Sequence, residues 1–512
     1  MTFQSILFEN PAPVAPAPDV VLQAAFLTDL QLSQIIDTVT AGREAYGLKP
    51  YFYMPLTSVQ SIKYRHGIMR DLRTGGLLAG IELFAETMRS MRDQLEQGAK
   101  LSYQGQREAL FLETVEIYCA AVNTLLAALQ RADVGSAGFA ALRKFLSGYV
   151  ASEYFRTLAA EAKNLRTDLA GMQYCFRIKG GRVTVAPYKS ERDYSVEVEQ
   201  TFRRFQQRAA KDHCAKTSVY LEMNHVEAMV LDRVAKLFPE VFAALDLFNN
   251  RNLDFVDPTI DRFDREVQFY LAYLAELKLL QEHGLQFCYP QVSQTSKEEL
   301  VQDTFDLALA DTLVKKNAPV VCNDFSLTGT ERIFVVSGPN QGGKTTFART
   351  FGQLHYLASL GYPVPGGQAK LFLPDRILTH FEREEDLKDL RGKLTDDLVR
   401  VHDVLNQATS NSIVILNEIF TSTTLSDAVF LCREVLTQIV DRDLLCVCVT
   451  FIDELAALSG STVSMVSTVV PDNPAVRTFK LERRPANGMA YALVLAEKYS
   501  LTYGRLTERI GS

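Results

Sequence analysis

The stretch GPNQGGKTT, Gly338–Thr346, decides the fold of the C-terminal half of this 512-residue chain. It fits the pattern G-x-x-x-x-G-K-[ST], follows the apolar run RIFVV and leads into the helical pattern FARTFGQLHYLASL. Where a strand, a glycine loop and a helix follow one another in this order, the loop amides and the helix N-terminus point at phosphate oxygens. The sequence therefore predicts a nucleotide-binding P-loop.

Each residue type in this loop has a chemical reason to be there. The glycines permit the backbone turns that aim consecutive amides at phosphates. Lys344 is expected to neutralise the β- and γ-phosphates, and the Thr345 hydroxyl is expected to bind Mg²⁺. The predicted cofactors are ATP and Mg²⁺, and the predicted nucleotide-binding residues are Gly338, Pro339, Asn340, Gln341, Gly342, Gly343, Lys344, Thr345 and Thr346.

A second apolar run, IVILNEIF, occupies Ile413 to Phe420, about 70 residues after the P-loop. A buried strand that ends in a magnesium-supporting acid belongs at this place, and it usually ends in Asp-Glu. Glu418 stands where a general base would orient the attacking water. Asn417 replaces the usual aspartate, which removes a negative charge but keeps a carbonyl oxygen for a metal-bound water. We predict Glu418 as the catalytic residue and Thr345 with Asn417 as the metal site.

The composition excludes several classes of protein. A net charge of −7 argues against a generally basic surface, so any nucleic-acid contact must come from a local basic patch. The scattered cysteines include Cys446 and Cys448 in LLCVCV, whose alternation predicts a strand core, and reduced buried thiols suit the cytoplasm. No signal-peptide pattern and no uninterrupted apolar run of roughly 18 residues is present. We therefore expect a cytoplasmic protein without membrane contact.

The pattern along the chain predicts a multidomain α plus α/β protein in three parts. Residues 1–19 form a Pro/Ala-rich lead-in, residues 20–285 are mainly helical, and residues 286–512 alternate strands with helices. The apolar runs APVVCNDFSL, RIFVVSG, SIVILNE and LLCVCVTF predict a mostly parallel sheet covered on both faces.

The last helix of the helical part has clear ends. Asp257 is a capping residue, Pro258 suits the first helical position, and Gly284 closes the helix. Between them, apolar residues at near-heptad spacing predict a long helix that packs on a partner helix. These residues are Ile260, Phe263, Val267, Leu271, Leu274 and Leu277.

One stretch inside the helical part alternates instead. Apolar and polar residues alternate on both sides of Gly180-Gly181 in YCFRIKGGRVTVAPY, Tyr174 to Tyr188. This alternation predicts a β-hairpin. Residues 177–211 hold nine Lys or Arg and four acids, a local positive excess in an acidic protein. A solvated surface and a DNA-contacting element both explain this excess.

Taken together, these motifs resemble the MutS mismatch-repair ATPase family within the ABC-type ATPase group. The last ~200 residues carry the resemblance in GPNQGGKTT, LASLGYPVPG, DRILTHF, ILNEIFTSTTLSDA, TFIDELAAL and AEKYSLTYGRLTERI, and PLTSVQSIKYRHGIMRDL is weakly similar to the start of the family's core, or lever, domain. The resemblance implies a helical lever domain at 20–285 with a clamp-like insert at about 173–211, followed by a MutS-type P-loop ATPase domain at 286–512. It implies DNA contacts by Arg177, Lys179, Arg182, Lys189 and Arg192.

The same resemblance implies a homodimer in which each nucleotide lies between one subunit's P-loop and the other's signature loop. In RGKLTDD, Thr395 is the hydroxyl nearest to the family's Ser-Thr-Phe signature, and Asp427 lies in the segment that crosses the interface. Phe451 stands where the family has a histidine that senses the γ-phosphate. Since Asn417 is altered as well, we expect slow ATP hydrolysis.

No stretch matches the family's mismatch-reading domain, connector domain or C-terminal helix-turn-helix, so we expect recognition of a junction, end or recombination structure rather than a mispair. The expected function is an ATP-switched dimeric clamp on mismatched, branched or otherwise structured DNA in repair or recombination, with a possible repair-protein partner. The alternative is an ATP-dependent switch that grips a protein without direct DNA recognition, which the acidic net charge favours. A metabolic kinase is a weaker hypothesis, because no acceptor site or lid pattern is visible.

Overall fold

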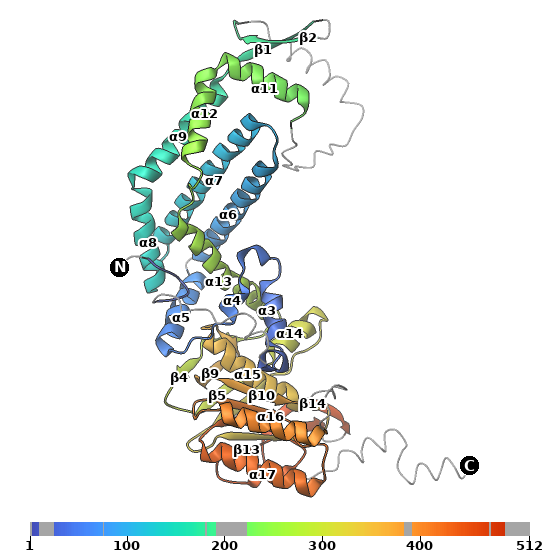
Figure 1. Cartoon of the computed structure of the whole chain (residues 1–512). Helices are drawn as coiled ribbons and strands as arrows, with labels where there is room; N and C mark the ends of the chain where they lie inside the picture. The colour runs from blue at the N-terminus through green and yellow to red at the C-terminus, as the bar shows by residue number, and fades with distance from the viewer. Residues whose placement is uncertain are drawn as a thin grey trace, which may run out of the picture. The chain divides into compact units, whose positions relative to one another are not determined.

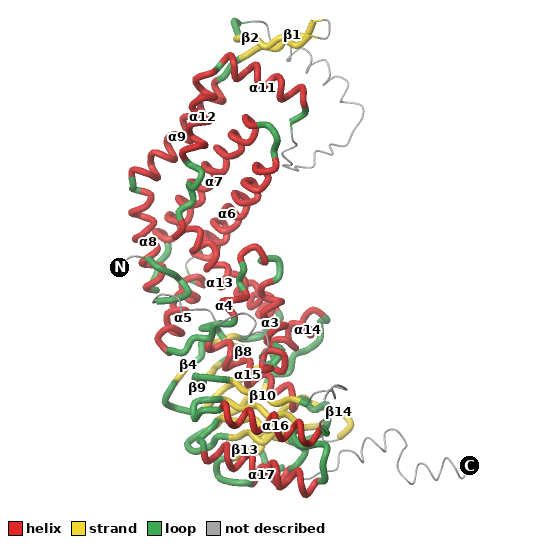
Figure 2. The backbone as a smooth tube through the Cα atoms, in the orientation of Figure 1, coloured by secondary structure: helices red, strands yellow, loops and turns green. Residues whose placement is uncertain are grey.

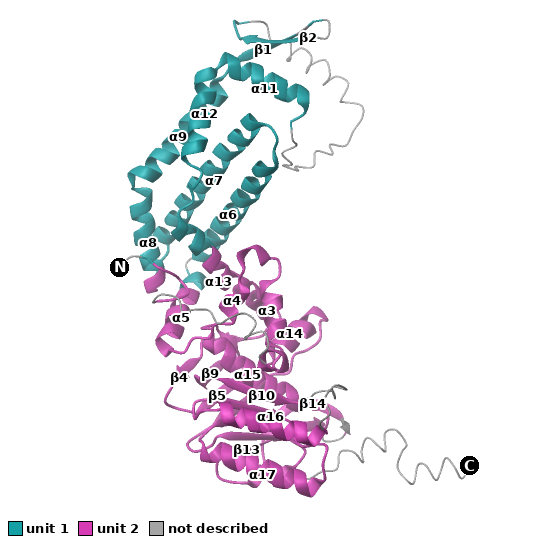
Figure 3. Cartoon of the chain, viewed as in Figure 1, with its two compact units in different colours: residues 1–3, 71–135, 139–264 teal, residues 4–70, 136–138, 265–512 magenta. Residues whose placement is uncertain are grey.

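The chain is a mixture of helices and sheets that divides into two compact units (Figures 1, 2 and 3). This computed structural model describes residues 3–9, 25–74, 76–179, 182–190, 223–382, 392–470 and 473–486. Unit 1 comprises residues 1–3, 71–135 and 139–264, and unit 2 comprises residues 4–70, 136–138 and 265–512. These units are defined by compactness, so the domain boundaries predicted at residues 19 and 285 stay predictions.

The described residues of unit 1 form helices and one hairpin, as the apolar spacing of its sequence predicts (Figure 3). Helices α6 and α7 pack against each other, and the buried residues of α6 recur at three- and four-residue spacing, for example Ile81, Phe84 and Met88. The described elements are α6 (Leu77–Lys100), α7 (Gln104–Arg131), α8 (Ala137–Val150), α9 (Glu153–Gly171), β1 (Tyr174–Lys179), β2 (Arg182–Pro187), α11 (His225–Leu237) and α12 (Pro239–Arg251).

Helix α7 is, among the described residues, the one helix long and apolar enough to cross a membrane. Of its most apolar window, 56% is buried inside the structure, and a core helix of a folded domain passes the same test of length and composition. Residues such as Leu112, Val115 and Val122 of α7 are fully buried. Packing within unit 1 therefore explains the apolar composition of this helix.

The long helix α13 (Pro258–Glu282) has the ends that the sequence predicts. Asp257 Oδ1 accepts a hydrogen bond from the backbone N–H of Thr259 at 2.7 Å, which caps the first turn. Gly284 follows the helix with φ of 83°, a conformation that suits glycine. The predicted apolar seam is confirmed as buried; its members Ile260, Phe263, Val267, Leu271, Leu274 and Leu277 are all at most 9% exposed.

Unit 2 contains the main sheet, which has six strands among the described residues, in the order β10-β11-β12-β7-β13-β14. Strands β10, β11, β12, β7 and β13 run parallel, and β14 is antiparallel to β13. The predicted parallel strands RIFVVSG, SIVILNE and LLCVCVTF are confirmed as β7, β11 and β12, and Cys446 and Cys448 are buried in β12. The bounds are β7 (Ile333–Ser337), β10 (Ile377–Phe381), β11 (Ile413–Asn417), β12 (Leu445–Val449), β13 (Thr462–Val470) and β14 (Asn473–Arg483).

Helices cover both faces of this sheet. Val414 and Leu416 of β11 face a core formed with α16 (Lys393–Gln407) and α17 (Leu425–Asp441). Ile415, which points to the opposite face, lies against α15 (Lys344–Ser359), where the Ile415 side chain would be 2.9 Å from a Cβ added at Gly352. The central strands are therefore buried on both faces, which accounts for their uninterrupted apolar runs.

The prediction for APVVCNDFSL is wrong in one respect, because its strand β6 (Asn323–Leu327) does not join the parallel sheet. It pairs antiparallel with β5 (Glu299–Thr304) in a sheet of order β4-β9-β5-β6. Only Phe325 and Leu327 of β6 are buried, an alternation typical of a half-covered antiparallel strand. The other strands of this region are β4 (Gln291–Ser293), β9 (Gln368–Phe372) and the pair β3 (Phe287–Cys288) and β8 (Val364–Pro365).

The remaining elements of unit 2 include its N-terminal segment, which packs inside the unit. Ile6 and Leu7 are fully buried, and the backbone N–H of Ile6 donates to Glu266 Oε2 at 2.9 Å. Most of α5 and of α13 belongs to this unit. The helices concerned are α2 (Ala25–Asp29), α3 (Leu32–Thr40), η1 (Glu44–Tyr46), α4 (Lys49–Phe52), α5 (Val59–Arg73), α14 (Leu307–Lys315) and η2 (Asp453–Ala457).

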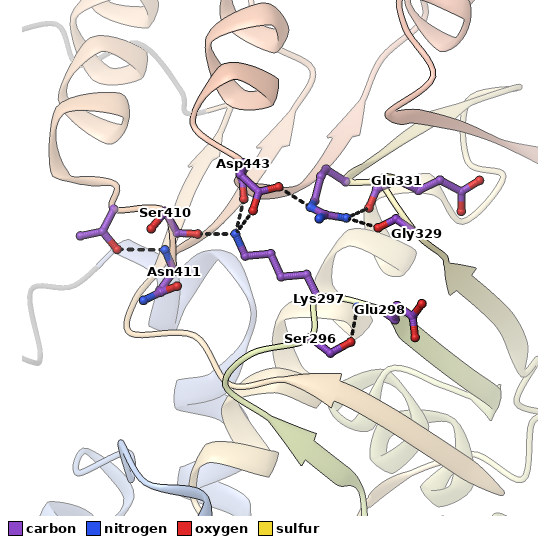
Figure 4. Close-up of polar contacts among 10 residues, drawn as sticks. Ser296, Lys297, Glu298, Gly329, Glu331, Ser410, Asn411 and Asp443 are labelled. Atoms are coloured by element: carbon purple, nitrogen blue, oxygen red, sulfur yellow. Dashed lines mark hydrogen bonds and ion pairs between the residues drawn. The ribbon is translucent and has the colours of Figure 1, made fainter.

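A polar cluster ties the amino-terminal ends of the central strands together (Figure 4). Lys297 Nζ donates to the carbonyl of Ser410 at 2.8 Å and to Asp443 Oδ2 at 2.7 Å, and Arg332 Nε donates to Asp443 Oδ1 at 2.6 Å. Burial opposes the charge of Asp443, but these hydrogen bonds hold the pKa of its carboxyl below the ordinary value. Since this end of the sheet is closed by the cluster, the carboxyl ends of the strands are the place to look for a ligand.

Candidate nucleotide site

The predicted P-loop joins the carboxyl end of β7 to the N-terminus of α15. Gly338 and Gly343 have φ of 120° and 95°, which only glycine adopts readily. Strand β13 also runs close to the loop. A Cβ on Gly342 would lie 2.3 Å from Ser467 Oγ, which donates a hydrogen bond to the carbonyl of Gly342 at 2.5 Å. Glycine is therefore required in this loop both by the backbone turn and by the neighbouring strand.

Lys344 lies inside the loop and is only 4% exposed. Its Nζ donates to the carbonyls of Gly338 and Pro339 at 3.1 and 3.3 Å, and it is 3.8 Å from Glu418 Oε1. Burial lowers the pKa of Lys344, and the nearby Glu418 carboxylate opposes this effect. A cation held among carbonyls at the N-terminus of α15 gives an entering phosphate a charge and a helix end to bind.

The two residues predicted to hold the metal are brought together by the fold. Thr345 Oγ1, at the first turn of α15, donates to Asn417 Oδ1, at the end of β11, over 3.0 Å. Asn417 is 7% exposed, so its carboxamide is fixed in place beside the loop. A hydroxyl and a carbonyl oxygen are the kinds of donor that Mg²⁺ prefers. These residues, with the open glycine cradle, fit a magnesium-bound triphosphate.

Glu418 has a backbone conformation that takes its side chain out of the strand. Its φ is 54°, in the left-handed region, and its backbone N–H donates to the carbonyl of Val449 at 2.9 Å. A non-glycine residue in this region costs about 1–3 kcal/mol and persists where the surrounding structure holds it. The carboxylate is partly exposed beside Lys344, a position that suits a group acting on water at the phosphates.

A cavity of about 260 Å³ lies beside the P-loop and was not predicted from the sequence. It is bounded at the loop by Gly343 and Thr346. At its edge, Phe479 is 49% exposed with φ of 59°, and the Asn323 side chain donates to the carbonyl of Phe479 at 3.1 Å. No local motif signals this cavity, because its apolar lining comes from separate parts of the chain: Leu309, Leu313, Pro319, Val320, Val321 and Phe479.

The residues predicted at a dimer interface are both exposed. Thr395 lies in the first turn of α16, where its backbone N–H donates to the carbonyl of Gly392 at 2.9 Å. Asp427 lies in the first turn of α17, and its Oδ2 accepts a hydrogen bond from Thr424 Oγ1 at 2.8 Å. Phe451, after β12, is 52% exposed. No interaction that the structure describes joins Thr395 or Asp427 to the P-loop of the same chain.

The predicted hairpin is confirmed by the pairing of β1 with β2 in unit 1. The strands are antiparallel, and Lys179 is paired with Arg182 at the end next to the turn. The side chains of Arg177, Lys179, Arg182 and Lys189 are exposed. Arg192 and the Gly180-Gly181 turn lie outside the described residues. The basic residues therefore belong to unit 1, whereas the P-loop belongs to unit 2.

A parallel sheet whose strand β7 leads through a glycine loop into α15 gives the C-terminal part of unit 2 the α/β architecture in which P-loops occur. Residues 334–494 match the family model for MutS domain V. This part of the chain is similar to MutS proteins, which agrees with the resemblance drawn from its motifs.

Curated relatives align with this chain over lengths similar to that of the family match. The DNA mismatch repair protein MutS of Rickettsia massiliae is 31% identical over 176 residues, which cover 32% of this chain and 20% of the relative. Endonuclease MutS2 of Thermus thermophilus is 29% identical over 183 residues, 35% of this chain and 24% of the relative. MutS of Orientia tsutsugamushi is 26% identical over 190 residues, 37% and 21% respectively. The chain thus spans about a fifth to a quarter of the length of these relatives.

Proposed function

We propose that this chain binds ATP with Mg²⁺, hydrolyses it slowly, and uses the nucleotide state to clamp structured DNA as a homodimer in repair or recombination. The observation that carries the proposal is the contact of Thr345 Oγ1 with Asn417 Oδ1 at 3.0 Å beside the buried Lys344. Because of this contact, the loop that would bind the phosphates lies beside the two oxygens that would bind the metal. The similarity to proteins named MutS and MutS2 supports DNA as the macromolecular substrate.

Different residues of the site would bind the phosphates, enclose the base and orient the attacking water. Loop amides and Lys344 would hold the phosphates, with Lys344 exchanging its carbonyl contacts for phosphate oxygens. When bound, Mg²⁺ neutralises charge on the β- and γ-phosphates. The cavity beside Gly343, bounded by apolar side chains and Phe479, has the size and lining for the base. Glu418 would orient the attacking water and accept its proton.

Two substitutions favour slow hydrolysis. Asn417 supplies a neutral oxygen where P-loop ATPases have a carboxylate, so the metal is held with one negative charge fewer. Phe451 has no hydrogen-bonding group to contact a γ-phosphate. Since the glycine loop, Lys344 and Glu418 are in place, we infer a reduced rate of hydrolysis rather than its loss.

Exposed apolar side chains support a dimer at the nucleotide face. Leu425, Phe430 and Phe451 are 61%, 62% and 52% exposed and follow β11 and β12, at whose carboxyl ends the nucleotide would bind. Leu425 and Phe430 lie near the start of the same helix, α17, and neighbouring exposed apolar residues are typical of an interaction surface. A second subunit would cover them and bring its Thr395 and Asp427 to the nucleotide.

Glu418→Gln bound to Mg-ATP is therefore expected to dimerise at micromolar concentration, because the variant holds the nucleotide without consuming it. Multi-angle light scattering with and without Mg-ATP measures the mass. Leu425→Ser with Phe430→Ser in the same background should shift the protein back to monomer. A monomer in the presence of saturating Mg-ATP would contradict the dimeric arrangement.

The basic face of the hairpin supports contact with the phosphate backbone of DNA. Replacing Arg177, Lys179 and Arg182 with alanine should flatten the dependence of log K on log salt by roughly two to three, because each phosphate contact releases counterions on binding. Fluorescence anisotropy of labelled branched DNA at four salt concentrations measures the slope. The matched control replaces three exposed cations on helices of the same unit: Arg131, Lys144 and Lys163.

A second candidate function is an ATP-dependent switch that grips a protein partner, such as a repair protein, instead of DNA. The apolar side chains of the hairpin favour it, since Tyr174 and Phe176 are 39% and 49% exposed. An unchanged affinity and salt slope in the triple hairpin variant would move this candidate ahead of DNA clamping. The parent and the triple hairpin variant should bind nucleotide equally well, because Lys344 lies in the other unit.

A further inference from the structure

The hairpin of β1 and β2 has two chemically different faces. In an antiparallel pair, directly opposite residues share a face, and successive residues along a strand alternate between faces. The register pairs Phe176 with Val185 and Arg177 with Thr184, which separates the aromatic residues from the cations. One face carries Tyr174, Phe176, Val183, Val185 and Pro187, and the other carries Arg177, Lys179, Arg182 and Thr184 together with Cys175 and Ala186.

The apolar face is open over much of its area. Tyr174, Phe176 and Val183 are 39%, 49% and 42% exposed. The rings of Tyr174 and Phe176 contact each other, with centroids 5.5 Å apart and planes at 67°. A two-stranded hairpin gains little stability by itself, so a solvent-exposed pair of aromatic rings on it is better explained by a ligand than by folding.

We propose that Tyr174 and Phe176 stack on unpaired bases, so that the hairpin binds DNA with splayed or single-stranded nucleotides in preference to continuous duplex. This inference rests on the proposed DNA-clamp function and specifies its substrate class. The faces of bases inside a duplex are covered by their neighbours, whereas an unpaired base offers its face to an aromatic side chain. The rings would therefore discriminate between the two without reading sequence.

The opposite face of the hairpin favours nucleic acid over protein as the partner. Arg177, Lys179 and Arg182 place three exposed cations there, in a chain whose net charge is −7. A partner that packs only on the apolar face gains nothing from these charges, whereas a polyanion is attracted by them. A hairpin between the two strands of a DNA fork would meet bases on one face and phosphates on the other.

The test uses the full-length chain and three DNA probes of equal length: duplex, single strand and a fork with unpaired arms carrying 2-aminopurine at the branch. Tyr174→Ala with Phe176→Ala removes the rings, and Tyr174→Leu with Phe176→Leu keeps apolar bulk without an aromatic face. The matched control, Leu247→Ala with Leu253→Ala, removes two side chains that are 65% and 68% exposed on or beside α12. Equilibrium ATP binding and thermal melting verify that each variant is folded.

We expect the parent and the control to bind the fork at least tenfold more tightly than the duplex and to change 2-aminopurine fluorescence on binding. Both ring variants should lose at least tenfold on the fork and less than twofold on the duplex, together with the fluorescence change. Leucine variants that retain fork affinity, or a parent that binds fork and duplex equally, would overturn base stacking while leaving DNA binding intact. A parent that binds none of the three probes would overturn the proposed DNA function as well, and would leave protein docking as the use of the apolar face.

Discussion

Glu418→Gln is expected to lower steady-state ATP hydrolysis by about 10²- to 10⁴-fold, the range that a positioned general base contributes. The reason is its position: Glu418 leaves the strand at φ of 54° with its carboxylate 3.8 Å from Lys344 Nζ. Glutamine keeps the shape and hydrogen-bonding capacity but does not accept a proton from water. Phosphate release measured at saturating Mg-ATP gives the rate, and a fluorescent ATP analogue verifies that the nucleotide still binds.

Asn417→Asp is the informative companion variant. It restores a negative charge next to Thr345 Oγ1, which lies 3.0 Å from Asn417 Oδ1, so hydrolysis should equal or exceed that of the parent. The double variant with Glu418→Gln should be as slow as Glu418→Gln alone. Parent-like hydrolysis by Glu418→Gln would show that another group activates the water.

Lys344→Ala should weaken ATP binding at least tenfold, about 1.4 kcal/mol. This ammonium is buried among the loop carbonyls of Gly338 and Pro339, whereas Arg477, which reaches the loop from β14, donates to the carbonyl of Asn340 at 3.2 Å. Titration with a fluorescent ATP analogue measures the affinity. Lys278→Ala, which removes an exposed cation of the same unit, is the matched control.

Equal affinity in Lys344→Ala and the parent would remove the P-loop from the nucleotide site. Melting curves without nucleotide distinguish this outcome from misfolding. The free variant loses only contacts at the site, namely the hydrogen bonds of the ammonium within its own loop and its ion pair with Glu418, so the fold of unit 2 should persist. The melting temperature should then rise on ATP addition for the parent and much less for the variant.

The sequence predicts the elements around the glycine loop and the end of β11 well because their signals are local. GPNQGGKTT needs only its own glycines and its two flanking elements, and ILNE marks its own strand end. The hairpin is equally local, since alternation on both sides of a short turn suffices to predict it. In each of these cases the residues that define the element are neighbours in the chain.

What the sequence does not predict depends on contacts between distant segments. The cavity beside Gly343 is lined by residues near 309–321 and by Phe479. Their proximity follows only from the fold around the sheet β4-β9-β5-β6. The apolar run of β6 predicts a strand of the parallel sheet, yet β6 pairs antiparallel with β5. The contact of Ile6 with Glu266 joins the first segment of unit 2 to the segment that begins at residue 265, and neither segment alone predicts it.

The proposed function makes one central claim, namely that the proposed ATP site in unit 2 is coupled to the hairpin in unit 1 that is proposed to bind DNA. This coupling is measured most directly as the Kd of Glu418→Gln for forked DNA with and without Mg-ATP, and the Kd for ATP with and without DNA, at one salt concentration. We predict a change of at least fivefold, about 1 kcal/mol, and the same factor in both directions, because linkage is reciprocal. If ATP leaves the Kd for DNA unchanged and DNA leaves the Kd for ATP unchanged, the two sites are independent and the protein is not an ATP-switched clamp.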